Sequence, residues 1–153
     1  MKKILFAFVL LFAMSCQNAS EKKIPEPPKE IAQYSIEQFY KNESLTGGTF
    51  SNDESRLILS SNKTGIFNVY EIDIKSGEKK QLTFSEKESY FALDEVPNSE
   101  LILYTADKGG NENNHLYLLD KEGNSTDLTP GDEVKASFNG WTEDKKHMMY
   151  FSN

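Results

Sequence analysis

A repeat of about 46 residues runs along the chain and limits what it can fold into. Phe50, Val96 and Trp141 stand 46 and 45 residues apart, and each opens a polar turn followed by an apolar run. The middle copy of this turn reads as two residues shorter than the others. Tyr70 and Tyr117 recur at a spacing of 47 residues. Self-similarity at such a period indicates a solenoid, a propeller or an array of small units.

The later part of each copy repeats as well. Leu82-Thr83 and Leu128-Thr129 are 46 residues apart, and Gly77 and Gly123 mark the same turn in the two copies. Glycine suits a tight turn because it adopts positive φ without steric cost. Two copies are therefore complete, and a third begins near Trp141.

Each complete copy contains four short runs of β-branched and aromatic residues, separated by clusters of Asn, Asp, Gly and Ser. We expect strands over residues 47–51, 56–61, 67–74 and 79–84, and again over 89–96, 100–106, 115–120 and 125–129. No stretch after residue 45 has a helical period. The best helix candidate precedes the repeat at residues 35–42, with Ser35 as its N-cap.

Four antiparallel strands in every 46 residues are typical of the blade of a β-propeller, which closes a ring of about 4 to 8 blades. The same eight strands could also form a two-sheet sandwich, but a sandwich does not require its second half to repeat the turns of its first. We therefore expect an all-β chain that forms an incomplete β-propeller with TolB- or WD40-like blades. Its parts are a leading segment 34–45, blade one 46–84, blade two 88–129 and half of blade three 134–153.

The N-terminus is typical of an export signal. Two lysines precede an apolar run over residues 4–14, which is shorter than the roughly 20 residues that span a bilayer. The residues 13–16, Ala-Met-Ser-Cys, resemble the bacterial lipobox, in which the cysteine is lipidated and becomes the first mature residue. We expect a lipoprotein signal peptide over residues 1–16 with lipidation at Cys16, and the alternative is an incidental cysteine in an ordinary signal peptide.

The segment after Cys16 is polar, charged and proline-rich. Residues 17–33 are expected to form a flexible tether between a membrane and the folded part. Without Lys2 and Lys3, 15 basic residues face 24 acidic ones, a net charge of −9. Such a surface disfavours nucleic acid as a partner. The expected location is therefore the bacterial cell envelope, with the membrane contacted through the lipid anchor.

The segments "YSIEQFYKNESLTGGTFSNDESRLILSSNKTGIFNVYEIDIKSGEKKQLT", "YTADKGGNENNHLYLLDKEGNSTDLTPG" and "FNGWTEDKKHMMYFSN" cover most of residues 34–153. Together they resemble the N-terminal propeller of a bacterial S9 peptidase (prolyl oligopeptidase family), in the dipeptidyl aminopeptidase/acylaminoacyl peptidase branch. The repeat alone is similar to TolB-type propellers too, and "IEQFYKN" and "SSNKTGIFNVYEI" favour the peptidase. The resemblance implies a propeller that gates a C-terminal α/β-hydrolase domain. That domain carries the catalytic serine, aspartate and histidine, so no catalytic residue can be assigned in this chain.

The residues themselves indicate no catalytic or metal site. The nucleophile motif G-x-S-x-G is absent from the sequence. Ser60 and Ser61 are interpreted as turn or ladder residues at the end of a strand. His115 and His147 fall at unrelated repeat positions, so a metal site is not expected. No cofactor is expected either.

Two further features have structural interpretations. The loop "DKGGNENNH", residues 107–115, is rich in oxygen ligands, but its spacing misses the calcium-binding pattern D-x-[DN]-x-[DN]-G. A long hairpin tip explains its composition equally well. Trp141 is expected to be a buried aromatic residue between blades.

Three hypotheses of function follow from the sequence. The first is the propeller start of an exported serine peptidase, non-catalytic in itself, with peptides as substrates of the whole protein. The second is a TolB-like propeller lipoprotein that binds envelope proteins or peptides without catalysis. The third is a truncated product with no activity and incomplete folding.

Overall fold

The structure is a computed structural model that describes residues 31–153. The proposed signal peptide, Cys16 and nearly all of the tether lie outside the described residues. One short helix, α1 (Ile36–Tyr40), overlaps the predicted helical segment. Every strand belongs to one compact unit, Glu37–Asn153. Among the described residues, no helix has the length and apolar character needed to cross a membrane.

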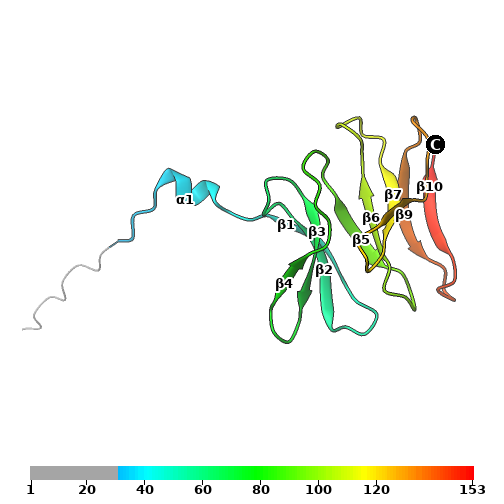
Figure 1. Ribbon diagram of the computed structural model, residues 1–153, viewed down its shortest axis with the longest axis horizontal. Coiled ribbons are helices and arrows are strands. Elements are labelled where there is room, and N and C mark those ends of the chain that lie inside the picture. Colours follow the sequence, from blue (N-terminus) through cyan, green and yellow to red (C-terminus); the bar gives the residue numbers. More distant parts are fainter. Residues whose placement is uncertain (1–30) are drawn as a thin grey trace, which may run out of the picture. The chain divides into compact units, whose positions relative to one another are not determined.

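The strands form three antiparallel sheets that follow one another along the chain (Figure 1). The first two sheets have four strands each, in the orders β1-β2-β3-β4 and β5-β6-β7-β8, and the third pairs β9 with β10. Their bounds are β1 (Leu45–Phe50), β2 (Arg56–Ser61), β3 (Asn68–Asp73), β4 (Lys79–Gln81), β5 (Phe91–Glu95), β6 (Ile102–Ala106), β7 (His115–Leu119), β8 (Ser125–Asp127), β9 (Ala136–Trp141) and β10 (Met148–Ser152). The predicted all-β class is confirmed, and each of the eight expected strands overlaps an observed one.

The repeat in the sequence is a repeat of hydrogen bonds in the structure. The Val69 N–H donates to the Thr83 hydroxyl oxygen at 2.8 Å, and the Leu116 N–H donates to that of Thr129 at 3.0 Å. Both threonines follow the fourth strand of their sheet and are buried. The two Leu-Thr pairs therefore close the last strand of each sheet in the same way.

The turns after the first strands are equal in length. In each copy one residue donates its N–H to the carbonyl five positions further on: Ser51 to Arg56, Val96 to Leu101 and Thr142 to His147. The prediction of a shorter middle turn is therefore wrong, and Glu95, not Val96, is the counterpart of Phe50 and Trp141.

The middle turn differs from the others in type. Asn98 is its third residue and has φ 57°, whereas in the other copies the fourth residues, Glu54 and Lys145, have φ 58° and 55°. Proline at the second position and positive φ at the third are features of a type II turn. Pro97 therefore changes the local conformation without changing the length, which explains why the letters suggested a shorter turn.

The first strand of every sheet has a β-bulge at the same place. The register shifts between Thr46 and Thr49 in β1, between Ala92 and Asp94 in β5, and between the partners of Met149 and Tyr150 in β9. At the bulge of β1, Gly47 has φ 68°, and a Cβ there would lie 3.2 Å from the Ala92 carbonyl oxygen. Glycine thus lets β1 approach β5 backbone to backbone.

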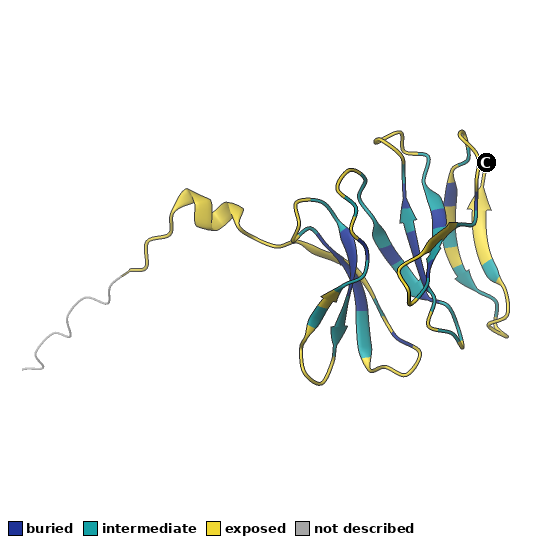
Figure 2. Cartoon of the chain, in the orientation of Figure 1, coloured by how far each residue is buried: buried dark blue, intermediate teal, exposed yellow. Residues whose placement is uncertain are grey.

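The core lies between the faces of successive sheets (Figure 2). Ile58 and Val69 of the first sheet pack in one cluster with Tyr104 of the second. Leu103 and Leu116 form a second cluster, together with residues of β9. Because neighbouring side chains of a strand point to opposite faces, Leu103 and Tyr104 place the second sheet between the other two.

Candidate functional site

Asp94 joins all three sheets. One of its carboxylate oxygens accepts the Thr49 hydroxyl of β1 at 2.8 Å, and the other accepts the indole N–H of Trp141 in β9 at 2.8 Å. Thr49 and Asp94 hold the same place in the repeat, just after the bulge. The first strands of the three sheets therefore meet at this carboxylate. Trp141 thus contacts the neighbouring sheet, but it is half-buried and not the buried aromatic residue that the sequence predicted.

An ion pair also joins the first two sheets. The Arg56 guanidinium lies 2.8 Å from Glu71 and 2.7 Å from Glu95, and the Glu95 side chain is only 2% exposed. Asn52 donates its side-chain N–H to Glu95 at 2.6 Å. Carboxylate partners raise the pKa of Arg56 even though burial opposes this shift. Glu95 is therefore a buried charge with two partners from the neighbouring sheet.

Ser60 has a role that the sequence did not suggest. It is fully buried, and its hydroxyl oxygen accepts the Ala92 N–H of β5 at 2.7 Å. Ser61 is also fully buried and donates to the Glu43 carboxylate. Both residues do end β2 as predicted, but Ser60 also satisfies a backbone group of the next sheet.

The third sheet leaves an apolar face open. Met149 holds the same place in the pairing of β10 with β9 as Ile58 does in the pairing of β2 with β1 and Leu103 in the pairing of β6 with β5. Met149 is therefore the counterpart of Ile58 and Leu103 in the repeat. Those two residues are completely buried, whereas Met149 is 41% exposed and Phe151, on the same face, is 67% exposed. β10 accordingly stands out as an exposed strand in Figure 2.

A polar pocket of about 340 Å³ lies at one end of the second sheet, under the loop between β6 and β7. Side chains from this loop, from β7 and from β8 line it, including Lys108, Asn111, Asn113, His115, Tyr117 and Asp127. Asp132 completes the rim. The loop is thus the tip of a long hairpin, as one of the two interpretations of its composition expected.

The pocket contains a histidine–carboxylate pair. His115 Nδ1 lies 2.8 Å from an Asp127 carboxylate oxygen, and the other oxygen of Asp127 accepts the Thr129 N–H at 2.9 Å. The His115 ring stacks near Tyr117 at 6.2 Å, and Tyr117 stacks on Tyr104 at 5.1 Å. Burial raises the pKa of Tyr104 to about 12 and also raises the pKa of Tyr117, so both phenols are uncharged at neutral pH.

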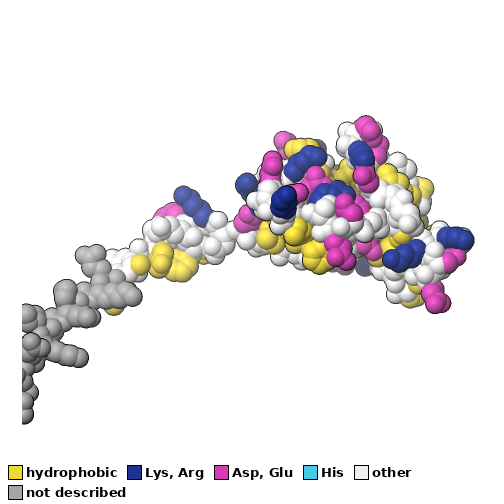
Figure 3. All heavy atoms as spheres, turned by 90° about the horizontal axis from the view of Figure 1, so that it is seen from below, with side chains coloured by type: hydrophobic (Ala, Val, Ile, Leu, Met, Phe, Trp, Pro, Cys, Tyr) yellow, Lys and Arg dark blue, Asp and Glu magenta, His cyan; other side chains and the backbone are white. Residues whose placement is uncertain are grey.

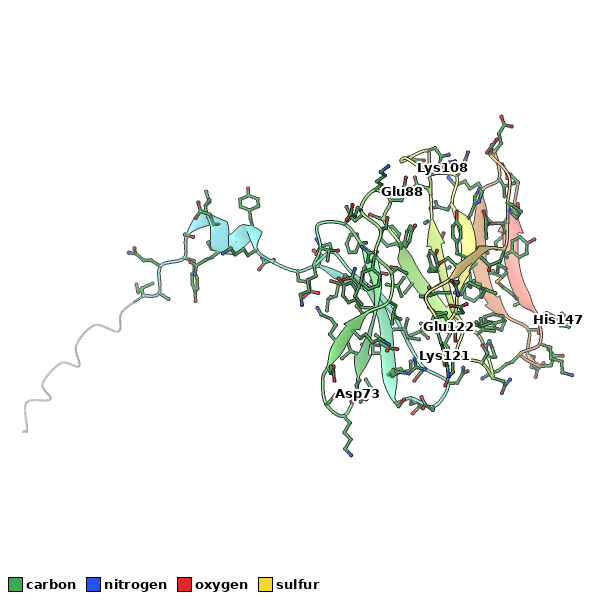
Figure 4. The ribbon with its side chains drawn as sticks, in the orientation of Figure 1. Asp73, Glu88, Lys108, Lys121, Glu122 and His147 are labelled. Atoms are coloured by element: carbon green, nitrogen blue, oxygen red, sulfur yellow. The ribbon has the colours of Figure 1, made fainter. Side chains whose placement is uncertain are left out.

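Neither histidine has the surroundings of a metal ligand. Within residues 31–153, no three His, Cys, Asp or Glu side chains converge in a way that could hold a metal ion. His147 lies in the turn between β9 and β10, and Figure 4 shows it far from Lys108 at the pocket. Cys16, the predicted lipidation site, is not among the described residues.

Comparison with known proteins assigns no family. No family model matches the chain, and no curated protein matches it.

Proposed function

We propose that the three sheets are consecutive blades of a β-propeller and that further blades cover the open face of β10. The observation that carries this proposal is the exposure of Met149, 41%, at a repeat position where Ile58 and Leu103 are 0% exposed. A blade packs its two faces against two neighbours, so a repeat residue is buried only when the next blade is present.

Hydrogen bonds at the first strands support a propeller over a sandwich. In a sandwich two sheets enclose one core, whereas here the second sheet has a core on each side. Asp94 holds β1 and β9 on its two oxygens, so the first strands gather on one side of the stack. The first strands of propeller blades gather in the same way around a central channel.

We further propose that the propeller belongs to an exported S9-type serine peptidase and controls the access of peptides to a hydrolase domain. The resemblance of residues 34–153 and the signal-like N-terminus support this proposal. The sheets themselves would be non-catalytic. Lipidation at Cys16 would anchor the protein in the cell envelope.

The test uses the protein made by its source cells. An antibody raised against residues 34–130 isolates it, and a fluorophosphonate probe then labels any activated serine. We expect a species several times heavier than 17.4 kDa that reacts with the probe. A heavy species that is not labelled would replace the peptidase with the non-catalytic TolB-like module. A species of 17.4 kDa would contradict both versions of the proposal.

A further inference from the structure

We infer that the pocket beside His115 and Asp127 binds a small organic cation that carries several N–H donors, such as an alkylguanidinium or alkylammonium group. This inference concerns the second sheet alone. It does not depend on a complete propeller or on peptidase activity.

The first sheet provides a comparison within the chain, because the equivalent place in that sheet is filled by a buried side chain and forms no pocket. Asn68 begins β3 as His115 begins β7, and it is completely buried. Its carbonyl oxygen accepts the Thr83 hydroxyl at 2.9 Å and the Ser85 N–H at 2.8 Å, and its NH₂ group donates to the Ser85 carbonyl at 3.0 Å. Every polar atom of this side chain is therefore satisfied inside the sheet.

In the second sheet the equivalent place forms the pocket. His115 and Asp127 replace Asn68 and Gln81, and the loop before β7 is two residues longer than the loop before β3. Because the Asp127 carboxylate only accepts, the Nδ1 atom of His115 carries the proton in their hydrogen bond. In the neutral form of the ring the Nε2 atom is then an acceptor, and it has no hydrogen-bond partner in the part of the chain that the structure describes.

The unused polar atoms around the His115–Asp127 pair are acceptors, whereas the unused donors of the pocket belong to Lys108, Asn111 and Tyr117. Each Asp127 oxygen has one partner and retains a lone pair, and His115 Nε2 is unused. The NH₂ group of Asn113 donates to the Asp132 carbonyl oxygen at 3.2 Å, and the side-chain oxygen of Asn113 has no partner among the described residues. A ligand that satisfies these atoms must bring donors.

The negative charge and the aromatic rings of the pocket favour a cation over a neutral ligand with many donors. Asp127 and Asp132 contribute two carboxylates to the pocket, and Lys108 is the single ammonium group among its lining residues. Lys108 is exposed and lies at the tip of the loop (Figure 4). The rings of Tyr117 and His115 line the pocket, and an aromatic ring attracts a cation through its face. The chain as a whole carries a net charge of −7, which also favours cationic partners.

The probes are agmatine, which carries a guanidinium and an ammonium group, and putrescine, which carries two ammonium groups. Binding to the full chain is measured by calorimetry, with glucose and inorganic phosphate as comparison ligands. We expect saturable binding of at least one cation with a dissociation constant of about 1 mM or below, and none of glucose or phosphate. The two cations distinguish a site for guanidinium from one for ammonium.

The variants follow the comparison within the repeat. The double variant His115→Asn with Asp127→Gln gives the second sheet the residues of the first, and we expect it to weaken binding about tenfold or more, the loss of one charged hydrogen bond. Gln81→Glu, at the matching place in the first sheet, is the control and should leave the affinity within about twofold. Circular dichroism verifies that both variants fold.

Three outcomes would overturn the inference. They are no saturable binding of either cation, preferential binding of glucose or phosphate, and equal affinity in the double variant and the unchanged chain. None of these outcomes bears on the size of the native protein or its labelling by a fluorophosphonate. Failure here is therefore distinct from failure of the proposed function.

Discussion

The indole N–H of Trp141 donates to the carboxylate of Asp94 at 2.8 Å, across the boundary between the second and third sheets. Thr49 donates to the other oxygen of the same carboxylate at 2.8 Å. One side chain thus holds the equivalent strands of three successive repeat copies. Its hydrogen bonds are charge-assisted and stronger than neutral ones, so it is a sensitive point at which to test contact between sheets.

Trp141→Phe keeps most of the aromatic ring and removes only the donor. We expect a loss of about 1.5–3 kcal/mol in the free energy of unfolding, the usual value for a hydrogen bond to a charged group. Urea denaturation followed by circular dichroism measures it. Phe138→Leu, which alters the ring packed against Trp141 without touching Asp94, is the control. An unchanged midpoint for Trp141→Phe would mean that the third sheet is not held at Asp94.

Arg56→Met should destabilise the chain by about 3–5 kcal/mol, because it leaves the buried Glu95 carboxylate without its cation. The double variant Arg56→Met with Glu95→Leu removes both charges and should recover most of that loss. Denaturation of the two variants side by side gives the comparison. If the double variant is as unstable as the single one, the ion pair itself holds the sheets together.

Leu103→Ala and Met149→Ala probe the same repeat position in two environments. Leu103 is completely buried between sheets, so its truncation should cost about 2–5 kcal/mol. Met149 is 41% exposed in this chain, and its truncation should cost less than about 1 kcal/mol. Equal costs, measured by urea denaturation, would show that the face of β10 is already covered, for example by a second copy.

Stability should fall in acid because several turn carboxylates have lowered pKa values. Hydrogen bonds from Ser51 and then from Ser55 hold the pKa of Asp53 well below its usual value of 3.8. The Asn124 side chain and then its N–H lower the pKa of Asp120 in the same way. A carboxyl whose folded pKa is lowered stabilises the fold above its unfolded pKa, and this contribution is lost as the pH falls toward the folded value.

The free energy of unfolding should therefore decrease as the pH falls below about 4, and Asp53→Asn should make that decrease shallower. Denaturation at about pH 5 and about pH 3 tests this. Glu54→Gln is the matched control, because the Glu54 side chain makes no hydrogen bond within the described residues. An equal acid sensitivity of Asp53→Asn and the unchanged chain would contradict the role given to Asp53.

The exposed charges of the sheets are of mixed sign on the face shown in Figure 3, where Lys and Arg alternate with Asp and Glu. Sequence composition alone predicts an acidic chain, whereas the pairing of charges such as Lys121 with Glu100 depends on the fold. Exposed pairs of this kind contribute little individually to stability.

Much of the fold could be read from the sequence because short apolar and aromatic runs mark most strands and each turn has its own residues. Gly77 and Gly123, predicted to take positive φ, have φ 73° and 88°. The length of the middle turn could not be predicted correctly, because Pro97 changes the type of turn and the sequence pattern of the other two turns is lost there. The paired role of His115 and Asp127 could have been found from the repeat, since they replace Asn68 and Gln81 at matching positions.

Contacts between sheets could not be read in the same way. Ser60 and Ala92 are 32 residues apart, and Asp94 and Trp141 are 47 residues apart. Alternation shows which face a side chain takes, but not which residue of the next sheet it meets. The partners of Ser60, Glu95 and Asp94 depend on how the sheets are stacked.

The most direct test of the account is the accessibility of position 149 in the native protein. Met149→Cys is introduced with Cys16 kept, and the rate of reaction with a thiol reagent, corrected for the protein without the new cysteine, is compared between the isolated chain and the protein produced by its source cells. We expect rapid labelling in the isolated chain, where this face is exposed, and strong protection in the native protein, where a further blade covers it. Equally rapid labelling in both would contradict the propeller proposal.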